Sequence, residues 1–360
     1  MRTMPGEYCI EGKHYSAQEL VDFASGVEND EKRPAWEREV YRFIHNWLIG
    51  KEKILQHSSG TTGISKEIKL SRNSMITSAR NTCRYFDLRK GNTALMCLPV
   101  EYIAGKMMIV RAFSCGLNLL LTEPKSKPVL PDAPKVDFCA MVPLQVANLL
   151  DSGYNLTALQ NLIIGGAEIS FELENRLKEL PVQAYATYGM AETCSHVALR
   201  KISAPAPQPD YHALPGVELS VDDRGCLVIT ADYLPETIVT NDLAELTGPG
   251  SFRWIGRFDN LINSGGVKVV PEELELRIRE MTGQECAVIG LPDRKLGQKL
   301  VLVIEKSKDP TREIMIMDEL KLLLPHKLQP KEIIGVEKFP RNPALKLDRR
   351  RLTKMVCQKQ

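Results

Sequence analysis

The sequence predicts an α/β protein with two domains, and three observations support this fold class. The chain has 360 residues, which is longer than one domain usually is. Short apolar segments alternate with helical segments between residues 94 and 185, a pattern typical of buried parallel strands covered by helices. After about residue 259 a smaller α+β pattern begins. We therefore expect a large N-terminal domain of β-sheets with flanking helices (residues 1–258) and a small C-terminal domain (residues 259–360).

The elements of the large domain can be assigned in order. Residues 36–48 have the apolar spacing of an amphipathic helix. Residues 54–56 and 67–70 read as two strands around a loop, and Ser71 can cap the helix that follows. Beyond this helix we expect strands at 94–98, 117–121, 138–142, 162–164 and 182–185, helices at 105–113, 145–150 and 171–180, and a hairpin of 217–221 with 226–229.

The small domain shows its own sequence of elements. Pro271 suits the first turn of a helix over 272–281. The apolar segments that follow predict strands at 288–289, 300–304 and 333–336, and a helix at 314–324.

Composition argues against several classes of protein. The formal net charge is +2, from 47 basic and 45 acidic residues, so no strong field favours nucleic acid or an anionic membrane. No segment approaches the roughly 20 apolar residues of a membrane span, and residues 1–20 lack the apolar core of a secretory signal. The nine cysteines form no CxxC pair, which favours reduced thiols in a cytoplasmic protein. The oligomeric state is not indicated.

The strongest functional signal is the loop of residues 58–66, with the sequence Ser-Ser-Gly-Thr-Thr-Gly-Ile-Ser-Lys. Its glycines allow the backbone to approach an anion closely, and its hydroxyl and N–H groups can surround phosphate oxygens. Lys66 adds a positive charge. The spacing differs from that of a Walker A loop. A flexible hairpin loop without a ligand is the alternative interpretation.

Further motifs follow this loop in the order found in the adenylate-forming superfamily, which the chain resembles. The loop itself is similar to the phosphate loop of that superfamily. The other matches are Gly165-Gly166-Ala167-Glu168, Tyr188-Gly189-Met190-Ala191-Glu192, Thr240-Asn241-Asp242, Gly256-Arg257-Phe258-Asp259-Asn260, Ser264-Gly265-Gly266, Pro271-Glu272-Glu273-Leu274-Glu275 and Leu345-Lys346-Leu347-Asp348-Arg349-Arg350. Together they resemble an AMP-forming acyl-CoA ligase, which implies the adenylate-forming fold with a mobile C-terminal domain.

The resemblance implies roles for the matching residues in nucleotide binding. The ATP phosphates would be held by Ser58, Ser59, Gly60, Thr61, Thr62, Gly63 and Lys66. Further ATP- or AMP-binding residues would be Gly166, Ala167, Glu168, Tyr188 and Gly189, with the Tyr188 ring stacked on adenine. Asp242 would bind the ribose hydroxyls, and Arg257 would lie near the ribose and the α-phosphate.

The same resemblance implies the residues of the reaction itself. Glu192 would be catalytic through Mg²⁺, a hard cation that prefers oxygen ligands, and Lys346 would be a mobile catalytic cation. ATP and CoA would be the co-substrates. Gly265 and Gly266 would border the CoA channel, Asp259 would be the hinge between domains, and Gly165 and Met190 would contact the acid.

Several positions depart from the family pattern. Ser65 replaces a proline, Asn241 replaces a glycine, and Ala191 stands where many members have a threonine that can contact the α-phosphate. The chain before the phosphate loop is also shorter than in most members. A degenerate, non-catalytic nucleotide-binding protein therefore stays an alternative to the enzyme.

Arg111 is the main indication of the acid. It follows a Met-Met-Ile-Val run in a helix that we expect to be buried, and a buried cation needs an anion. That anion could be a protein carboxylate, a helix end or a second carboxylate on the substrate. The segment 98–111 resembles o-succinylbenzoate–CoA ligases of menaquinone biosynthesis, in which a basic residue at this place faces the substrate, although Glu101-Tyr102 replaces Phe-His and Ala104 replaces Ser.

The sequence therefore predicts the activation of o-succinylbenzoate, an aromatic dicarboxylate, with ATP and its transfer to CoA. Two other activities stay open. One is a ligase for another aryl or short-chain acid such as benzoate, and the other is an adenylation domain that loads a carrier protein.

Overall fold

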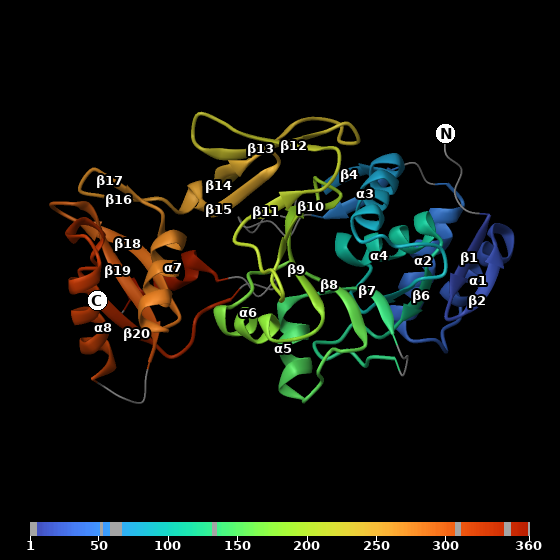
Figure 1. Cartoon of the computed structure of the whole chain (residues 1–360), viewed down its shortest axis with the longest axis horizontal. Coiled ribbons are helices and arrows are strands. Elements are labelled where there is room, and N and C mark those ends of the chain that lie inside the picture. Colours follow the sequence, from blue (N-terminus) through green and yellow to red (C-terminus); the bar gives the residue numbers. More distant parts are fainter. Residues whose placement is uncertain are drawn as a thin grey trace. The chain divides into compact units, whose positions relative to one another are not determined.

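The computed structural model describes residues 6–50, 53–57, 67–131, 135–306, 311–341 and 347–358 (Figure 1). The chain forms two compact units. Unit 1 contains Met1–Leu219, Ile229–Ile238 and Gly248–Ser251, and unit 2 contains Ser220–Val228, Val239–Thr247 and Phe252–Gln360. The domain boundary after residue 258 stays a prediction.

Unit 1 is built on a mixed β-sheet in the strand order β2-β1-β6-β5-β7-β8-β9-β10-β11. The pairs from β1 through β9 are parallel, whereas β1–β2, β9–β10 and β10–β11 are antiparallel. The bounds are β1 Glu7–Ile10, β2 Lys13–Ser16, β5 Thr93–Met96, β6 Asn118–Leu121, β7 Val136–Met141, β8 Leu159–Ile164, β9 Gln183–Met190, β10 Ser195–Lys201 and β11 Tyr211–Ala213. The predicted buried parallel strands are confirmed.

Helices cover both faces of this sheet (Figure 1). Helices α5 (Pro143–Asp151) and α6 (Phe171–Lys178) pack Val146, Leu149 and Leu173 against alternate residues of β7, β8 and β9. Helices α3 (Arg72–Tyr85) and α4 (Ile103–Cys115) lie on the other face, where the Arg111 guanidinium approaches the Phe138 ring. The alternation follows because successive side chains of a strand point to opposite faces. Helices α1 (Ala17–Glu28) and α2 (Ala35–Leu48) pack on each other.

Two hairpin regions complete the strand-rich part of the chain. Strands β3 (Lys53–His57) and β4 (Glu67–Ser71) pair antiparallel and bracket residues 58–66. The Ser71 side chain accepts a hydrogen bond from the Ser74 N–H, so the predicted helix cap of α3 is confirmed. Strands β12 (Val217–Val221), β13 (Cys226–Ala231), β14 (Ile238–Gly248) and β15 (Ser251–Arg257) are neighbours in that order, and the division between the units passes through them.

Unit 2 has a second sheet centred on β19 (Gly297–Glu305). This strand pairs antiparallel with β16 (Ile262–Ser264) and β18 (Cys286–Asp293) and parallel with β20 (Glu332–Val336), while β17 (Val267–Val269) pairs with β16. Helices α7 (Pro271–Thr282) and α8 (Arg312–Leu323) pack on one face, and α9 (Arg349–Cys357) on the other. The short 3₁₀ helices η1 (Phe258–Asn260) and η2 (His326–Leu328) complete the unit.

A buried ion pair fixes the start of α9. The guanidinium of Arg349 binds both carboxylate oxygens of Glu275 on α7, at 2.7 and 2.6 Å, and donates to the Val288 carbonyl. Burial raises the pKa of Glu275 to about 7, although Arg349 acts in the opposite direction. Because an unpaired charge at this depth is costly, the pair holds α9 to α7 and thereby fixes the chain that follows residue 346.

The cysteines differ from the sequence-based expectation. Cys83 on α3 and Cys115 on α4 form a disulfide with their Cα atoms 6.8 Å apart, so the expectation of reduced thiols is wrong for this pair. Their 32-residue separation carries no recognisable motif, and only the packing of α3 on α4 brings them together. The other seven cysteines are free.

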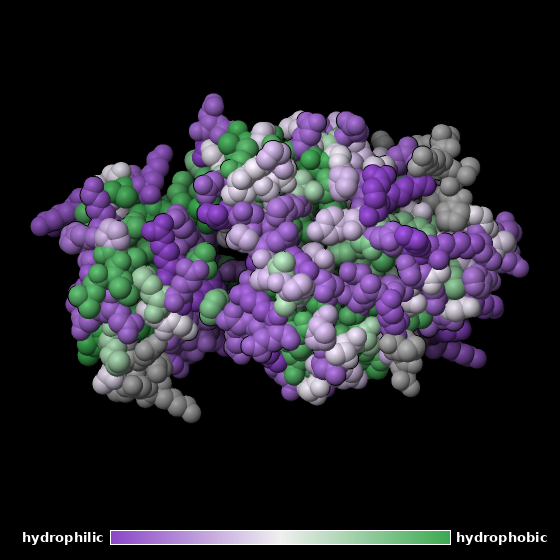
Figure 2. Space-filling model, viewed as in Figure 1, coloured by the Kyte–Doolittle hydropathy of each residue, from purple (hydrophilic) through white to green (hydrophobic). Residues whose placement is uncertain are grey.

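Hydrophilic and hydrophobic residues are mixed on the visible surface of the molecule (Figure 2). Among the helices of the described residues, none combines the length and the apolar character that a membrane span requires.

Two glycines in helices of unit 1 should respond oppositely to alanine. A Cβ on the buried Gly105 of α4 would lie 2.2 Å from the Pro99 carbonyl oxygen, whereas a Cβ on the exposed Gly26 of α1 would meet nothing within 4 Å. We expect Gly105→Ala to lower the free energy of unfolding by about 1–3 kcal/mol or more. Gly26→Ala should raise it by about 0.5–1 kcal/mol because alanine costs less backbone entropy in a helix. Urea unfolding of the two variants measures both effects, and a stable Gly105→Ala protein would contradict the packing at the start of α4.

Candidate functional site

The candidate residues of unit 1 gather at the carboxyl edge of the parallel sheet, where α/β proteins bind ligands. Residues 165–168 directly follow β8, and Tyr188, Gly189 and Met190 end the neighbouring strand β9. Glu192 lies in the turn that follows. The structure therefore brings the predicted adenine-, acid- and metal-binding residues of unit 1 to one edge.

Two glycines permit the close backbone contacts at this edge. A Cβ on Gly165 would lie 2.0 Å from the hydroxyl of Thr187 on β9. A Cβ on Gly189 would lie 2.2 Å from the Ser195 carbonyl oxygen and 2.5 Å from the Cα of His196. A larger residue at Gly189 would meet the backbone of β10, so this position requires glycine, whereas a larger residue at Gly165 would displace the Thr187 side chain.

Tyr188 is half-buried near the end of β9. Its ring meets the edge of Tyr211 on β11, with centroids 5.9 Å apart. Tyr211 in turn lies 5.7 Å from the guanidinium of Arg200, which forms a two-point ion pair with Glu174 at 3.0 and 2.8 Å. This chain of contacts orients the Tyr188 ring, which an aromatic base could stack on.

The turn after β9 is organised by Thr193. Its fully buried hydroxyl accepts from the Met190 N–H at 2.9 Å and lies 2.5 Å from the Ser195 carbonyl oxygen, to which it donates. The next two residues, Cys194 (φ 56°) and Ser195 (φ 106°), have left-handed backbone conformations that cost energy for non-glycine residues. Thr193 therefore stabilises a strained turn that presents Glu192 and Ser195 together.

Glu192 is half-buried, and within the described residues its carboxylate forms no hydrogen bond or ion pair. The described parts of the chain also contain no group of three or more His, Cys, Asp or Glu residues that could hold a metal ion. A single available carboxylate fits Mg²⁺, which keeps several waters and uses one or two carboxylates together with phosphate oxygens. It does not fit a zinc centre.

Arg111 is buried to 1% exposure between α4 and the sheet. Its Nη2 donates to Ser195 Oγ at 3.1 Å and to His196 Nδ1 at 3.3 Å, and its Nη1 approaches the sulfur of Met108 at 3.8 Å. Its Nε–H has no hydrogen-bond partner among the described residues. Burial lowers the pKa of Arg111 to about 9, so the guanidinium stays charged near neutral pH.

The partners of Arg111 are neutral. No carboxylate of the described residues pairs with it, so the protein carboxylate considered above as its anion is not found there. A buried charge without a counter-ion is costly. The site thus holds a positive charge and an unused buried N–H, which together favour the binding of an anion.

The candidate residues of unit 2 form a separate polar cluster. Arg257 donates to Asp242 at 3.1 Å and to Asp259 at 3.0 Å, and Asn241 donates to Asp259 at 3.2 Å. Asp242 is buried, and its backbone N–H donates to the Thr240 hydroxyl. Asn241, a departure from the family pattern, therefore supplies a contact to the predicted hinge residue.

The predicted border of the CoA channel is a tight turn. Gly265 and Gly266 join β16 to β17 with φ angles of 60° and 81°, and the Gly265 N–H donates to the Leu296 carbonyl at 2.9 Å. The phosphate-binding candidates Ser58, Ser59, Gly60, Thr61, Thr62, Gly63 and Lys66, and the catalytic candidate Lys346, lie outside the described residues. Their roles stay predictions.

The sequence did not reveal the polar residues that support the site. His196 and Thr82 contact each other at 3.2 Å beside Arg111. Lys106 on α4 binds Gln56 Oε1 at 2.7 Å and the Leu55 carbonyl at 3.1 Å, which ties β3 to the start of α4. The only sequence signal was their position, since His196 follows the Tyr-Gly-Met-Ala-Glu motif closely and Lys106 lies in the segment that contains Arg111.

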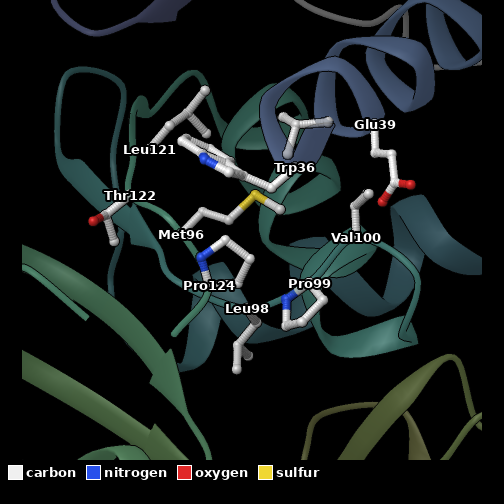
Figure 3. A pocket seen from close by; sticks show the side chains of 10 residues that line it. Trp36, Glu39, Met96, Leu98, Pro99, Val100, Leu121, Thr122 and Pro124 are labelled. Carbon is white, nitrogen blue, oxygen red and sulfur yellow. The ribbon is translucent and has the colours of Figure 1, made fainter. Parts of the chain in front are cut away.

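A small cavity of about 30 Å³ lies elsewhere in unit 1, between α2 and the ends of β5 and β6 (Figure 3). Apolar side chains including Trp36, Met96 and Leu121 line it (Figure 3). It has room for about one water molecule, far too little for a nucleotide or an aromatic acid. We therefore do not assign the functional site to it.

Comparison with known proteins agrees with this architecture. The AMP-binding enzyme family matches residues 48–230. An acyl-CoA synthetase (AMP-forming)/AMP-acid ligase II-like protein from Dyadobacter fermentans is 35% identical, with 92% of this chain and 98% of that chain covered and a TM-score of 0.62. The chain belongs to the family of AMP-binding enzymes.

Within this family, the chain is similar to 2-succinylbenzoate–CoA ligases. That of Bacillus mycoides is 25% identical over 339 residues, which cover 83% of this chain and 69% of that one. The o-succinylbenzoate CoA synthetase of Bacillus subtilis, solved with an acyl-adenylate intermediate, has the same fold, with a TM-score of 0.74 at 17% identity over 96% of this chain and 95% of that chain. The predicted adenylate-forming fold and the predicted class of enzyme, an AMP-forming carboxylate–CoA ligase, are confirmed.

The role of Thr193 in the turn can be tested with a matched pair of variants. Thr193→Val removes the hydroxyl and leaves the Met190 N–H without its acceptor, whereas Thr193→Ser keeps the hydroxyl. We expect Thr193→Val to lower the free energy of unfolding by about 1–3 kcal/mol because a buried donor is left unsatisfied. Thr193→Ser should lose less. Equal stability of the two variants in urea unfolding would show that the hydroxyl does not hold the turn.

Proposed function

We propose that the chain activates o-succinylbenzoate with ATP and transfers it to CoA, giving o-succinylbenzoyl-CoA, AMP and pyrophosphate in menaquinone biosynthesis. The observation that supports this acid most directly is Arg111. It is a fully buried cation whose partners among the described residues are neutral and leave one N–H unused, and Ser195 links it to the turn that contains Glu192. The similarity to 2-succinylbenzoate–CoA ligases points to the same acid.

A second carboxylate on the substrate accounts for this environment. One carboxylate of o-succinylbenzoate is activated, and the other stays ionised throughout the reaction. An ionised group that enters a buried pocket loses its hydration and needs a charged hydrogen-bond donor in return. Arg111 is such a donor, whereas a monocarboxylic acid such as benzoate would leave it unpaired.

In the first half-reaction, the succinyl carboxylate of the acid attacks the α-phosphorus of ATP, and pyrophosphate leaves. Residues 58–63 and Lys66 would bind the β- and γ-phosphates, and Tyr188 would stack on adenine beside Gly166 and Ala167. Asp242 would accept hydrogen bonds from the ribose, near Arg257. Glu192 would hold Mg²⁺, whose charge offsets that of the phosphates. Lys346 would stabilise the charge that develops during adenylation.

In the second half-reaction, the CoA thiol attacks the mixed anhydride and releases AMP. Gly265 and Gly266 would border the path of the pantetheine arm. In this proposal, residues 1–258 form a large domain, and residues 259–360 form a small domain that rotates about Asp259. The rotation would let one site serve two transition states. It also places the enzyme in the cytoplasm, with ATP and CoA as its co-substrates.

Removal of the Arg111 charge should lower the activity on acids with a second carboxylate more than the activity on acids without one. We expect Arg111→Met to lower kcat/KM for o-succinylbenzoate at least about 30-fold, because a desolvated charge loses its partner, at a cost of about 2 kcal/mol or more. The value for benzoate should stay within about threefold, since benzoate has no second carboxylate. A coupled assay for AMP and thioester measures both acids. An Arg111→Met enzyme with unchanged kcat/KM for o-succinylbenzoate would disprove this role.

Lys346→Ala should separate the two half-reactions. The exchange of pyrophosphate into ATP, which reports adenylation, should fall at least about 100-fold, the usual effect of removing one charge-stabilising donor. Thioester formation from acyl-adenylate supplied directly should stay within about threefold, because the lysine acts before CoA. Equal losses in both half-reactions would show that Lys346 does not act in adenylation alone.

ATP binding by the unaltered chain without turnover of any acid would instead favour a non-catalytic nucleotide-binding protein.

A further inference from the structure

His196 is a buried histidine on β10 that lies directly behind the Arg111 guanidinium. We propose that His196, held as one neutral tautomer by Thr82, is the positioning residue that aims Arg111 at the second carboxylate of the acid. This inference rests on the proposed function of Arg111. It assigns the selectivity for dicarboxylic acids to a hydrogen-bonded chain that begins on α3, in addition to Arg111 itself.

The hydrogen bonds determine which nitrogen of His196 carries the proton. An arginine side chain has donors only, so His196 Nδ1, 3.3 Å from Arg111 Nη2, must accept and cannot be protonated. In a neutral imidazole the proton then lies on Nε2, which donates to the Thr82 hydroxyl at 3.2 Å. The Thr82 hydroxyl donates in turn to the Ser78 carbonyl at 3.2 Å.

All the hydrogen bonds of this series are donated in the same direction, from Arg111 towards Ser78. The Ser78 carbonyl accepts from Thr82, Thr82 accepts from His196, and His196 accepts from Arg111. A reversed tautomer would leave two N–H groups facing each other at Arg111. Burial lowers the pKa of His196 well below its ordinary value, and the charge of Arg111 acts in the same direction. The hydrogen bonds require a neutral His196, and the surroundings favour the same neutral form.

Within this proposal, the Nε–H of Arg111 is the donor that meets the substrate. Arg111 Nη2 is engaged by His196 and by Ser195, whose hydroxyl also lies 3.4 Å from His196 Nδ1. Within the described parts of the chain, the buried Nε–H has no hydrogen-bond partner. Two acceptors hold Nη2 in place and so restrict the rotation of the guanidinium. The Nε–H therefore points in one fixed direction, along which an oxygen of the acid could accept its hydrogen bond.

Three separate elements fix this geometry. Thr82 comes from α3, Arg111 from α4 and His196 from β10, and the Cys83–Cys115 disulfide joins α3 to α4 next to Thr82. The bonds connect positions 85 and 114 residues apart in the chain. A substitution at Thr82 or His196 should therefore alter the selectivity for acids without changing the binding of the nucleotide.

Variants of His196 test the proposal through acid selectivity. His196→Phe keeps a ring but removes both hydrogen bonds, whereas His196→Asn places an amide oxygen near the position of Nδ1 and restores an acceptor for Arg111. We expect His196→Phe to lower kcat/KM for o-succinylbenzoate about tenfold or more, and that for benzoate less than about threefold. His196→Asn should recover most of the loss, and KM for ATP should stay the same in both variants.

The double variant separates positioning from general stability. If His196 acts through Arg111, His196→Phe should cause no further loss of selectivity in the Arg111→Met background, because the group that it positions is already absent. Equal losses on both acids would overturn the proposal, as would a His196→Phe effect that is as large in the Arg111→Met background as in the unaltered chain. Either result would indicate a structural role alone.

A spectroscopic measurement keeps the two proposals distinguishable. If Arg111→Met leaves the acid selectivity unchanged, the proposed role of Arg111 fails, yet the orientation of its guanidinium can still be tested. The ¹⁵N NMR signals of His196, identified by their loss in His196→Asn, should show a neutral ring with the proton on Nε2 between about pH 6 and 8. Thr82→Val should shift the Nε2 signal. A proton on Nδ1, or a charged ring, would overturn the hydrogen-bonded chain.

Discussion

The buried charge of Arg111 is the constraint around which the candidate acid site is arranged. A guanidinium with 1% exposure has lost its water and must be compensated by the protein or by a ligand. Among the residues that the structure describes, its hydrogen-bond partners are neutral, namely Ser195 Oγ, His196 Nδ1 and the sulfur of Met108. These partners hold the side chain in place but do not neutralise it, which is why we propose a ligand with negative charge as its counter-ion.

The position of this charge follows from the parallel sheet. Parallel strands place their carboxyl ends at one edge, and here the ends of β8 and β9 supply Gly165 and Tyr188 at that edge. The close contacts of Gly165 and Gly189 keep the strand ends together, and Thr193 holds the strained turn that returns the chain as β10. As a result Glu192, Ser195 and His196, which are near neighbours in sequence, lie at the same edge, where Ser195 and His196 contact Arg111. We propose a metal ion as the partner of Glu192 and the acid as the partner of Arg111.

Regular elements with strong local patterns could be predicted from the sequence. The apolar runs gave β5 to β9, the helical spacing gave α2 and α4, and Ser71 and Pro271 marked the starts of α3 and α7. The strands β1 and β2 were not predicted, because they are four residues long and partly polar, so that their pairing depends on tertiary contacts with β6. Helices α1 and α9 and strands β10, β11, β14, β15, β16 and β17 were also not predicted.

The candidate site was predictable only in part, for a related reason. Motif order identified the nucleotide-binding candidates, and Arg111 stood out because a charge interrupts an apolar run. The partners of Arg111 could not be found in this way. Thr82 and His196 are ordinary polar residues in sequence, and only the packing of α3, α4 and β10 joins them. The Cys83–Cys115 disulfide depends on the same packing.

A crystal structure with o-succinylbenzoate and AMP bound would test the central claim most directly. We expect an oxygen of the free carboxylate to lie about 2.7–2.9 Å from Arg111 Nε, the usual length of a charge-assisted hydrogen bond, while His196 Nδ1 still accepts from Nη2. A free carboxylate that lies in solvent, with Arg111 Nε unpaired or bound to a protein group, would contradict it.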